Sequence, residues 1–110
     1  YNLGILEKKL GRDDRAKKYF IKTLDVAPHF QNAHYSLGLL AFKQGKHQNA
    51  LLHFQKIIEF DKTNAKAHNA IGNVLYLLGD MDAARKAFEE AIRLDPDNVE
   101  ANHNLQQDFQ

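Results

Sequence analysis

Cysteine does not occur in the 110-residue chain, and proline occurs only twice. The absence of cysteine excludes disulfide bonds and thiolate metal sites, and it favours an intracellular, cytoplasmic location. The scarcity of proline, together with only six glycines, predicts few turns and long secondary-structure elements. No apolar run approaches the roughly 20 residues that span a bilayer, so we expect no membrane segment within this chain.

A large excess of charge is also missing, because the formal net charge is only +1. A nearly neutral chain gives no reason to expect a nucleic acid or a membrane surface as partner. The charge is nevertheless uneven. Residues 1–64 carry eleven Lys and Arg against six Asp and Glu, and residues 65–110 carry four against eight. A basic and an acidic end predict weak head-to-tail self-association, which can extend into a filament.

Side chains that carry chemistry are few. Ser36, Thr23 and Thr63 are the only serine and threonine residues, and none has a visible base partner that would make it a nucleophile. The six histidines include no H-E-x-x-H motif and no pair spaced four residues apart, so we expect them to pack with a polar tip. The glycines form neither a G-x-G-x-x-G motif nor a P-loop. We therefore predict that the chain is not an enzyme and binds no cofactor or metal.

A repeat of 34 residues dominates what is present. The stretch "AHYSLG" at residues 33–38 returns as "AHNAIG" at residues 67–72. A period of this length is typical of repeat architectures, in which each unit is one supersecondary element. Four columns share one register, with one residue from each unit: Gly4, Gly38 and Gly72; Gly11, Gly45 and Gly79; Ala16, Ala50 and Ala84; and Phe20, Phe54 and Phe88.

Each unit has the pattern of two helices. In the third unit, apolar residues at helical spacing predict a first helix over residues 65–78 and a second over residues 81–94. Asn64 and Asp80 stand where these helices begin and can cap their free amide groups. Gly79 permits the left-handed turn between them. The other units follow the same plan, so the fold class is all-α.

Small residues are expected to let the two helices of a unit approach closely. Gly72 and Ala84 lie where the antiparallel helices would cross, and a large side chain at either position would push the helix axes apart. Phe88 is the large residue that fills the space beside them. One such hairpin cannot bury its apolar stripe alone, so neighbouring units are expected to stack and form a continuous core.

This skeleton resembles the tetratricopeptide repeat, and the resemblance covers essentially the whole chain. It implies a right-handed α-solenoid of antiparallel helix pairs with 34-residue units at residues 1–30, 31–64 and 65–98. The first unit lacks the opening turn of its first helix, which indicates a fragment of a longer protein. The chain departs from the family pattern where histidines replace the first aromatic residue and where Lys62 replaces the closing proline. These departures predict individual packing between units.

The end of the chain, residues 99–110, forms either a capping helix or the start of a fourth unit. The helix is expected over residues 99–109, and in its register the position of the close-packing glycine is Gln106. No glycine is needed there if no second helix follows, so we predict a capping role. We expect Val99, Ala101, Leu105 and Phe109 to cover the third unit, and Gln106, Gln107 and Asp108 to face water.

In the family that the chain resembles, the first helix of each unit lines an inner groove. Aromatic side chains on this face suit apolar anchors, and amides can bond an extended peptide backbone. The resemblance therefore implies a scaffold or adaptor that binds a protein or peptide partner, and lysines near the N-terminal end favour acidic residues in that partner. The expected groove residues are Lys8, Lys9, Leu39 and Lys43, with Tyr35, Phe42 and Tyr76 as anchors and Asn69 and Asn73 as backbone-holding amides.

Two kinds of site known in the family match only in part. The clamp that holds chaperone C-terminal carboxylates is matched by Asn73 and Asn104, but Asn69 stands where the clamp has lysine. We therefore do not predict that clamp. The asparagine ladder of the O-linked N-acetylglucosamine transferases is half complete in the corresponding column, which is Asn2, Ser36, Ala70 and Asn104.

Other interpretations stay open beside the scaffold hypothesis. The segment is alternatively a structural or self-associating spacer whose groove binds nothing, or the regulatory repeat region of a larger enzyme such as a glycosyltransferase. RNA binding of the pentatricopeptide kind is disfavoured, because that repeat is about 35 residues long and normally basic on its inner face.

Overall fold

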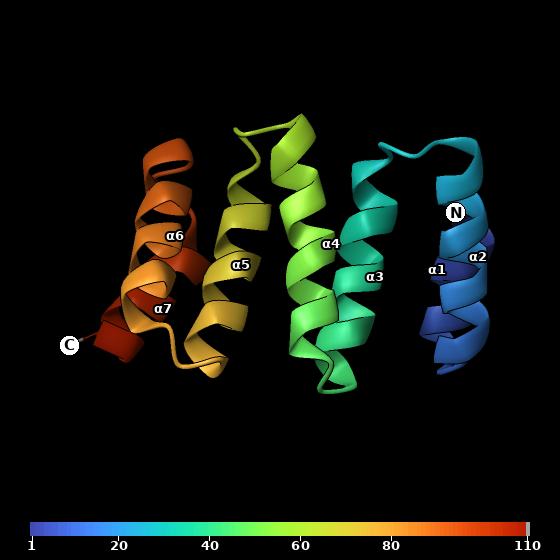
Figure 1. The fold of residues 1–110 in the computed structure, drawn as a ribbon, viewed down its shortest axis with the longest axis horizontal. Helices are drawn as coiled ribbons and strands as arrows, with labels where there is room; N and C mark the ends of the chain where they lie inside the picture. The colour runs from blue at the N-terminus through green and yellow to red at the C-terminus, as the bar shows by residue number, and fades with distance from the viewer. Residues whose placement is uncertain (110) are drawn as a thin grey trace.

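The computed structural model describes residues 1–109, and the side chains of residues 1–107. The described residues form seven α-helices and no strand. Three antiparallel pairs stand side by side in one row, and the molecule measures 40 × 25 × 22 Å (Figure 1). The predicted all-α, right-handed solenoid is confirmed. The helices are α1 (Asn2–Lys9), α2 (Asp13–Val26), α3 (Gln31–Lys43), α4 (His47–Phe60), α5 (Ala65–Leu77), α6 (Met81–Leu94) and α7 (Val99–Phe109).

In each helix pair a phenylalanine ring occupies the place of a missing side chain. A Cβ atom added at Gly72 would lie 2.5 Å from an atom of the Phe88 ring, and Phe88 itself is fully buried. Only glycine allows this contact, so the predicted close approach is confirmed, with the ring of Phe88 as the near neighbour. The same contact joins Gly4 with Phe20 and Gly38 with Phe54.

The turn inside a pair depends on glycine for a different reason. Gly79 has a φ of +86°, in the left-handed region that other residues rarely adopt. Its amide donates to the carbonyl oxygen of Tyr76 at 3.1 Å, and the amide of Asp80 donates to the carbonyl oxygen of Leu75 at 3.0 Å. Asp80 then caps α6, because its carboxylate accepts from the amide of Ala83 at 3.3 Å. The predicted turn and cap are both present, and α5 ends one residue earlier than expected.

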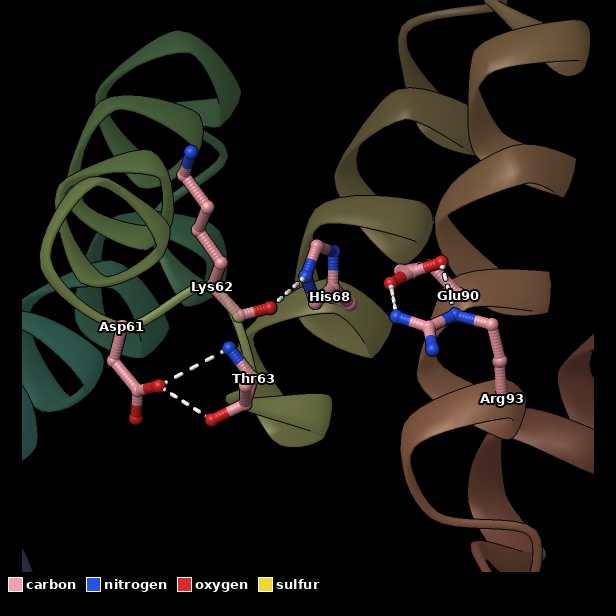
Figure 2. Close-up of polar contacts among 6 residues, drawn as sticks. All are labelled: Asp61, Lys62, Thr63, His68, Glu90 and Arg93. Atoms are coloured by element: carbon pink, nitrogen blue, oxygen red, sulfur yellow. Dashed lines mark hydrogen bonds and ion pairs between the residues drawn. The ribbon is translucent and has the colours of Figure 1, made fainter.

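A side chain in the first turn of the next helix ties down each loop between pairs. Nε2 of His68 lies 3.0 Å from the carbonyl oxygen of Lys62 (Figure 2). His68 therefore has the structural role that was expected for it. The same contact, reaching six residues back along the chain, is made by His34 to Pro28 at 2.9 Å and by Asn102 to Pro96 at 3.2 Å.

The last helix, α7, packs against α6 through one side. Ala101 is fully buried and Leu105 is half-buried. The prediction that Val99 covers the third unit is wrong, because Val99 is 80% exposed. At 100° per residue, Val99 lies about 200° around the helix from Ala101 and so faces away from α6. Gln106 and Gln107 are exposed as expected, and the side chains of Asp108 and Phe109 lie outside the described residues.

No helix in the described part of the chain is both long enough and apolar enough to cross a membrane.

Candidate functional site

The inner face is the surface formed by the first helices of successive pairs, α1, α3 and α5, and by α7. On α3, Tyr35, Leu39 and Phe42 are spaced four and three residues apart, which puts them on one side of the helix. Asn69 and Asn73 occupy the positions of Tyr35 and Leu39 one unit later. The structure brings these five predicted residues together around one pocket, called the groove pocket below.

The groove pocket is small and mainly apolar. Its volume is about 60 Å³, which corresponds to roughly two water molecules. Phe54 of α4 forms part of its wall, and the Tyr35 and Phe54 rings lie 5.6 Å apart between centroids. Ala70 and Glu100 also line it. The repeat register assigns Phe54 to the core, and Glu100 is the α7 counterpart of the inner-face positions Asn32 on α3 and Lys66 on α5.

Two charged groups flank the Tyr35 ring. The Lys66 amine lies over the ring, 4.5 Å from its centroid, in a cation–π contact. Burial, and secondarily the Glu100 carboxylate, raise the pKa of the Tyr35 phenol above its ordinary value. The hydroxyl therefore stays protonated at neutral pH and can both donate and accept a hydrogen bond.

The two asparagines of the groove pocket are bonded to a third from α7. Nδ2 of Asn104 donates to Oδ1 of Asn73 at 3.0 Å and to Oδ1 of Asn69 at 3.3 Å. Asn69 lines the groove pocket, but the expectation that it is exposed there is wrong, because the residue is only 5% exposed. Asn104 covers it from a position 35 residues later in the chain, a contact that helical periodicity within α5 does not reveal.

The other predicted groove residues lie outside this pocket. The Lys43 amine is paired with the Asp13 carboxylate at 3.0 Å, in a contact that joins α3 to the start of α2. Tyr76 is half-buried on α5, and Lys8 and Lys9 lie at the end of α1. Lys8 and Tyr76 hold the repeat position of Phe42 in the first and third units, so both extend the inner face on either side of the pocket.

Among the described residues, no group of three or more His, Cys, Asp and Glu side chains could hold a metal ion.

Comparison with known families gives two matches. A tetratricopeptide-repeat model matches residues 1–65, and another model of the same description matches residues 65–98. A search of curated proteins finds no significant match.

Solved structures that are similar to this chain have the same fold at low sequence identity. The first tetratricopeptide domain of Spaghetti (RPAP3) has a TM-score of 0.91 at 22% identity, over 97% of this chain and 85% of that one. The second such domain of human RPAP3 has a TM-score of 0.89 at 21% identity, over 99% and 91%. MamA has a TM-score of 0.89 at 24% identity, over 98% and 63%. With its repeat register, its glycine–phenylalanine contacts and these matches, the chain belongs to the tetratricopeptide-repeat family.

Proposed function

We propose that the chain is a protein-interaction module that binds an extended peptide along its inner face. The observation that carries this proposal is the convergence of Tyr35, Leu39 and Phe42 with two asparagine amides on one pocket. Apolar anchors beside amide groups suit a peptide, whose side chains alternate with backbone donors and acceptors. The two RPAP3 domains support the proposal, since one is described as bound to an HSP90 peptide, SRMEEVD, and the other as in complex with an HSP70 peptide, SGPTIEEVD.

The volume of the groove pocket limits the size of the peptide side chain that can enter it. A volume of about 60 Å³ suits a small apolar side chain such as valine rather than an aromatic ring. The bonds from Asn104 occupy the amide oxygens of Asn69 and Asn73, which leaves the Nδ2 groups of both as donors. We assign the Asn73 donor to a peptide carbonyl, because Asn73 is the more exposed of the two.

The charges along the inner face give the peptide a direction. Glu100 stands at the α7 side of the groove pocket and disfavours a carboxylate there. Lys8 and Lys9 stand toward α1, at the other end. Acidic residues of the peptide therefore lie over α1, and we do not propose that a C-terminal carboxylate is clamped at the α7 side.

Selection from a displayed random-peptide library, followed by calorimetry with the enriched peptides, tests the site. The double variant Tyr35→Ala/Phe42→Ala is expected to lose at least about 2 kcal/mol of binding free energy, because both rings contact the ligand. Tyr19→Ala/Phe60→Ala is the matched control, since both of its rings lie on the second helices of their pairs. Retained affinity in the groove variant, or equal losses in both variants, would show that the inner face is not the site.

The direction of the peptide is tested by salt dependence. Lys8→Ala/Lys9→Ala is expected to slow association about threefold or more and to flatten the salt dependence of the rate, with a smaller effect on dissociation. Lys18→Ala/Lys22→Ala removes the same charge from α2 and serves as the control. An equal fall of the association rate in both variants would show that only the net charge of the protein, and not the position of the lysines, controls association.

Head-to-tail self-association stays a prediction. The N-terminal end of the row presents three leucines that are each more than half exposed and that a neighbouring helix could cover: Leu3 and Leu6 on α1, and Leu10 directly after it. Sedimentation at low and high salt decides between the alternatives. Concentration-dependent association that weakens with salt is expected from the charge asymmetry, and a monomer at high concentration in low salt would exclude it.

A further inference from the structure

A second and larger pocket lies on the opposite side of α3 from the groove pocket. It has a volume of about 330 Å³ and is called the outer pocket below. Leu37, Leu40 and Ala41 of α3 form its floor. Leu37 lies two residues after Tyr35, which is about 200° around the helix, so the two pockets occupy opposite faces of α3. The walls of the outer pocket come from α2 and α4.

The rim of the outer pocket is basic. Lys17 of α2 and both Lys46 and Lys56 near α4 line it, and no aspartate or glutamate does. Lys56 pairs with Glu59 at 3.4 Å, but both side chains are more than half exposed, so water screens the pair. In the described part of the chain, Lys17 and Lys46 form no ion pair. The rim therefore carries positive charge that the chain itself does not neutralise.

Two histidines form the wall between the apolar floor and the basic rim. The carbonyl oxygen of Pro28 can only accept, so Nε2 of His34 carries the hydrogen of that bond. Nδ1 of neutral His34 is then an acceptor, and it lies 3.4 Å from Nδ1 of His53, which donates. Nε2 of neutral His53 is left as an acceptor on the far side of its ring. The bond to Pro28 thus fixes the orientation of both imidazole rings, which give this wall polar groups in defined positions.

The outer pocket belongs to one place in the array and not to the repeat in general. Adding 34 to the residue numbers gives the corresponding residues between α4 and α6. Lys17 and Ala41 there become Leu51 and Leu75, and Leu51 packs against the core. The charges also change sign. The residues that correspond to Gln44, Lys46 and Lys56 are Leu78, Asp80 and Glu90.

Figure 2 shows this corresponding place one unit later. His68 stands where His34 stands in the outer pocket, and it makes the same bond to the preceding loop. Glu90 stands where Lys56 stands, and its carboxylate accepts from Nε of Arg93 at 3.0 Å. The second copy therefore keeps the histidine that bonds the loop, but it has a carboxylate where the outer pocket has a lysine. The histidine thus belongs to the packing of the repeat, whereas the positive charge is specific to the outer pocket.

We propose that the outer pocket is a second docking site, for a protein segment that presents one large apolar side chain flanked by acidic residues. A volume of about 330 Å³ over three nearly buried apolar residues accommodates a side chain of the size of phenylalanine. Lysines on α2 and α4 place positive charge on both sides of the bound apolar side chain. The carboxylates of the residues before and after it in the partner segment would lie beside these lysines. The proposal does not depend on the inner groove, because the two pockets share no lining residue.

A labelled peptide in which one phenylalanine has two glutamates on each side is the probe, and fluorescence anisotropy at low ionic strength measures its binding. Replacing its phenylalanine by alanine, or its glutamates by lysines, is expected to weaken binding about tenfold or more. Equal affinity for the probe and for its alanine version would show that the pocket does not hold an apolar side chain. Absence of saturable binding would overturn the whole proposal.

Variants of the protein locate the probe. Lys17→Leu/Ala41→Leu installs the residues of the next unit and is expected to weaken binding about tenfold, because it fills the floor and removes a charge. Lys46→Asp, an exposed change that leaves packing intact, is expected to weaken it about fivefold. Lys22→Asp is the control, since it makes the same charge change on α2 at a residue that does not line the outer pocket. Equal losses of affinity in Lys46→Asp and Lys22→Asp would show that the probe responds only to the net charge of the protein, and this would overturn the site.

Backbone NMR shifts on titration with the same probe provide a readout that does not depend on any variant folding. The largest shifts are expected at His34, Leu37, Ala41 and His53. Shifts centred on Tyr35, Leu39 and Asn73 would place the probe in the inner groove and overturn the assignment to the outer pocket.

Discussion

The two junctions between helix pairs share their skeleton and differ in their outer surface. In the first junction α3 lies between α2 and α4, and in the second α5 lies between α4 and α6 (Figure 1). Both have the glycine–phenylalanine contact and the histidine that bonds the preceding loop. The first is open and edged by lysines, whereas leucines and carboxylates occupy the same positions in the second. Packing is thus set by the repeated positions, and surface chemistry by those that do not repeat.

The junctions also differ in how much apolar surface their cores contain. Ile57 at the end of α4 is 1% exposed and belongs to the core of the second junction. The same position in α2 is Thr23, whose hydroxyl donates to the carbonyl oxygen of Tyr19 at 2.9 Å and adds little apolar contact. A threonine that bonds its own helix contributes less to the core than a buried isoleucine. The first junction is accordingly expected to be the less stable one.

The largest expected effect tests what the junctions share. Gly38→Leu and Gly72→Leu should each cost about 3 kcal/mol of unfolding free energy, because the new side chain meets the ring of Phe54 or Phe88. Denaturant unfolding measures the loss, and Gln48→Leu on the exposed side of α4 is the size control. A loss below about half a kcal/mol in both glycine variants would contradict the common skeleton.

The next effect tests the difference in the cores. Ile57→Ala should cost about 2–3 kcal/mol, since it leaves a cavity in a fully buried place. Thr23→Ala, at the same position in the first pair, should cost less than about 1 kcal/mol. Both values come from the same denaturant titration. Equal costs would mean that the two junctions are equally well packed and that the first is not the less stable one.

A smaller effect comes from the helix caps. The side chain of Asn64 accepts from the amide of Ala67 at 3.0 Å and donates to Oε1 of Gln31 at 2.9 Å, so it caps α5 and ties it to α3. The equivalent position before α3 is Phe30, which has no side-chain cap. Asn64→Ala should cost about 1 kcal/mol in the thermal unfolding free energy. Gln31→Ala keeps the cap and removes the bonds of Gln31 with Asn64 and with the exposed Asp61 carboxylate, so it should cost less. The reverse order would disprove a dominant role for the cap.

The smallest effect is a pH dependence specific to the first junction. Burial, then His34 and then Lys17 lower the pKa of His53 below its ordinary value, whereas the counterpart in the second junction is Ala87. A lowered pKa means that the folded state binds the proton less tightly than the unfolded state does. Stability is therefore highest above the ordinary histidine pKa of about 6.5 and falls as the pH decreases below it.

Replacing His53 by alanine should reduce this pH dependence. Unfolding free energies at pH 7 and pH 5 should differ less in His53→Ala than in the parent chain, with exposed His103→Ala as the control. An unchanged difference in His53→Ala would show that this side chain does not couple stability to pH.

The fold could be predicted from the sequence because its determinants occur three times. The contact of Gly72 with Phe88 and the turn at Gly79 depend on residue types that recur every 34 residues. Such a recurrence is not expected by chance. Helix boundaries followed from capping residues such as Asp80 for a similar reason. Local signals repeated in register give the fold without any knowledge of long-range contacts.

The site could be predicted only in part, because its shape and charge depend on residues that occur once and do not recur in every unit. Tyr35, Leu39 and Phe42 were predicted from the family resemblance, which assigns the inner groove to the first helix of each unit. The burial of Asn69 depends on Asn104, which comes from α7, and no pattern within α5 reports it. The other differences also depend on single residues. Lys43 is paired with Asp13, 30 residues earlier, and the outer pocket is lined by Ala41 and Lys17 where the next unit has leucines.

The most direct test of the inner face as the binding site is an NMR titration of the chain with a peptide enriched in the library selection. Amide shifts should concentrate on Tyr35, Leu39, Phe42 and Asn73 and should fade toward α2, α4 and α6. Shifts that instead concentrate on residues of the second helices, with these four unchanged, would contradict binding at the inner face.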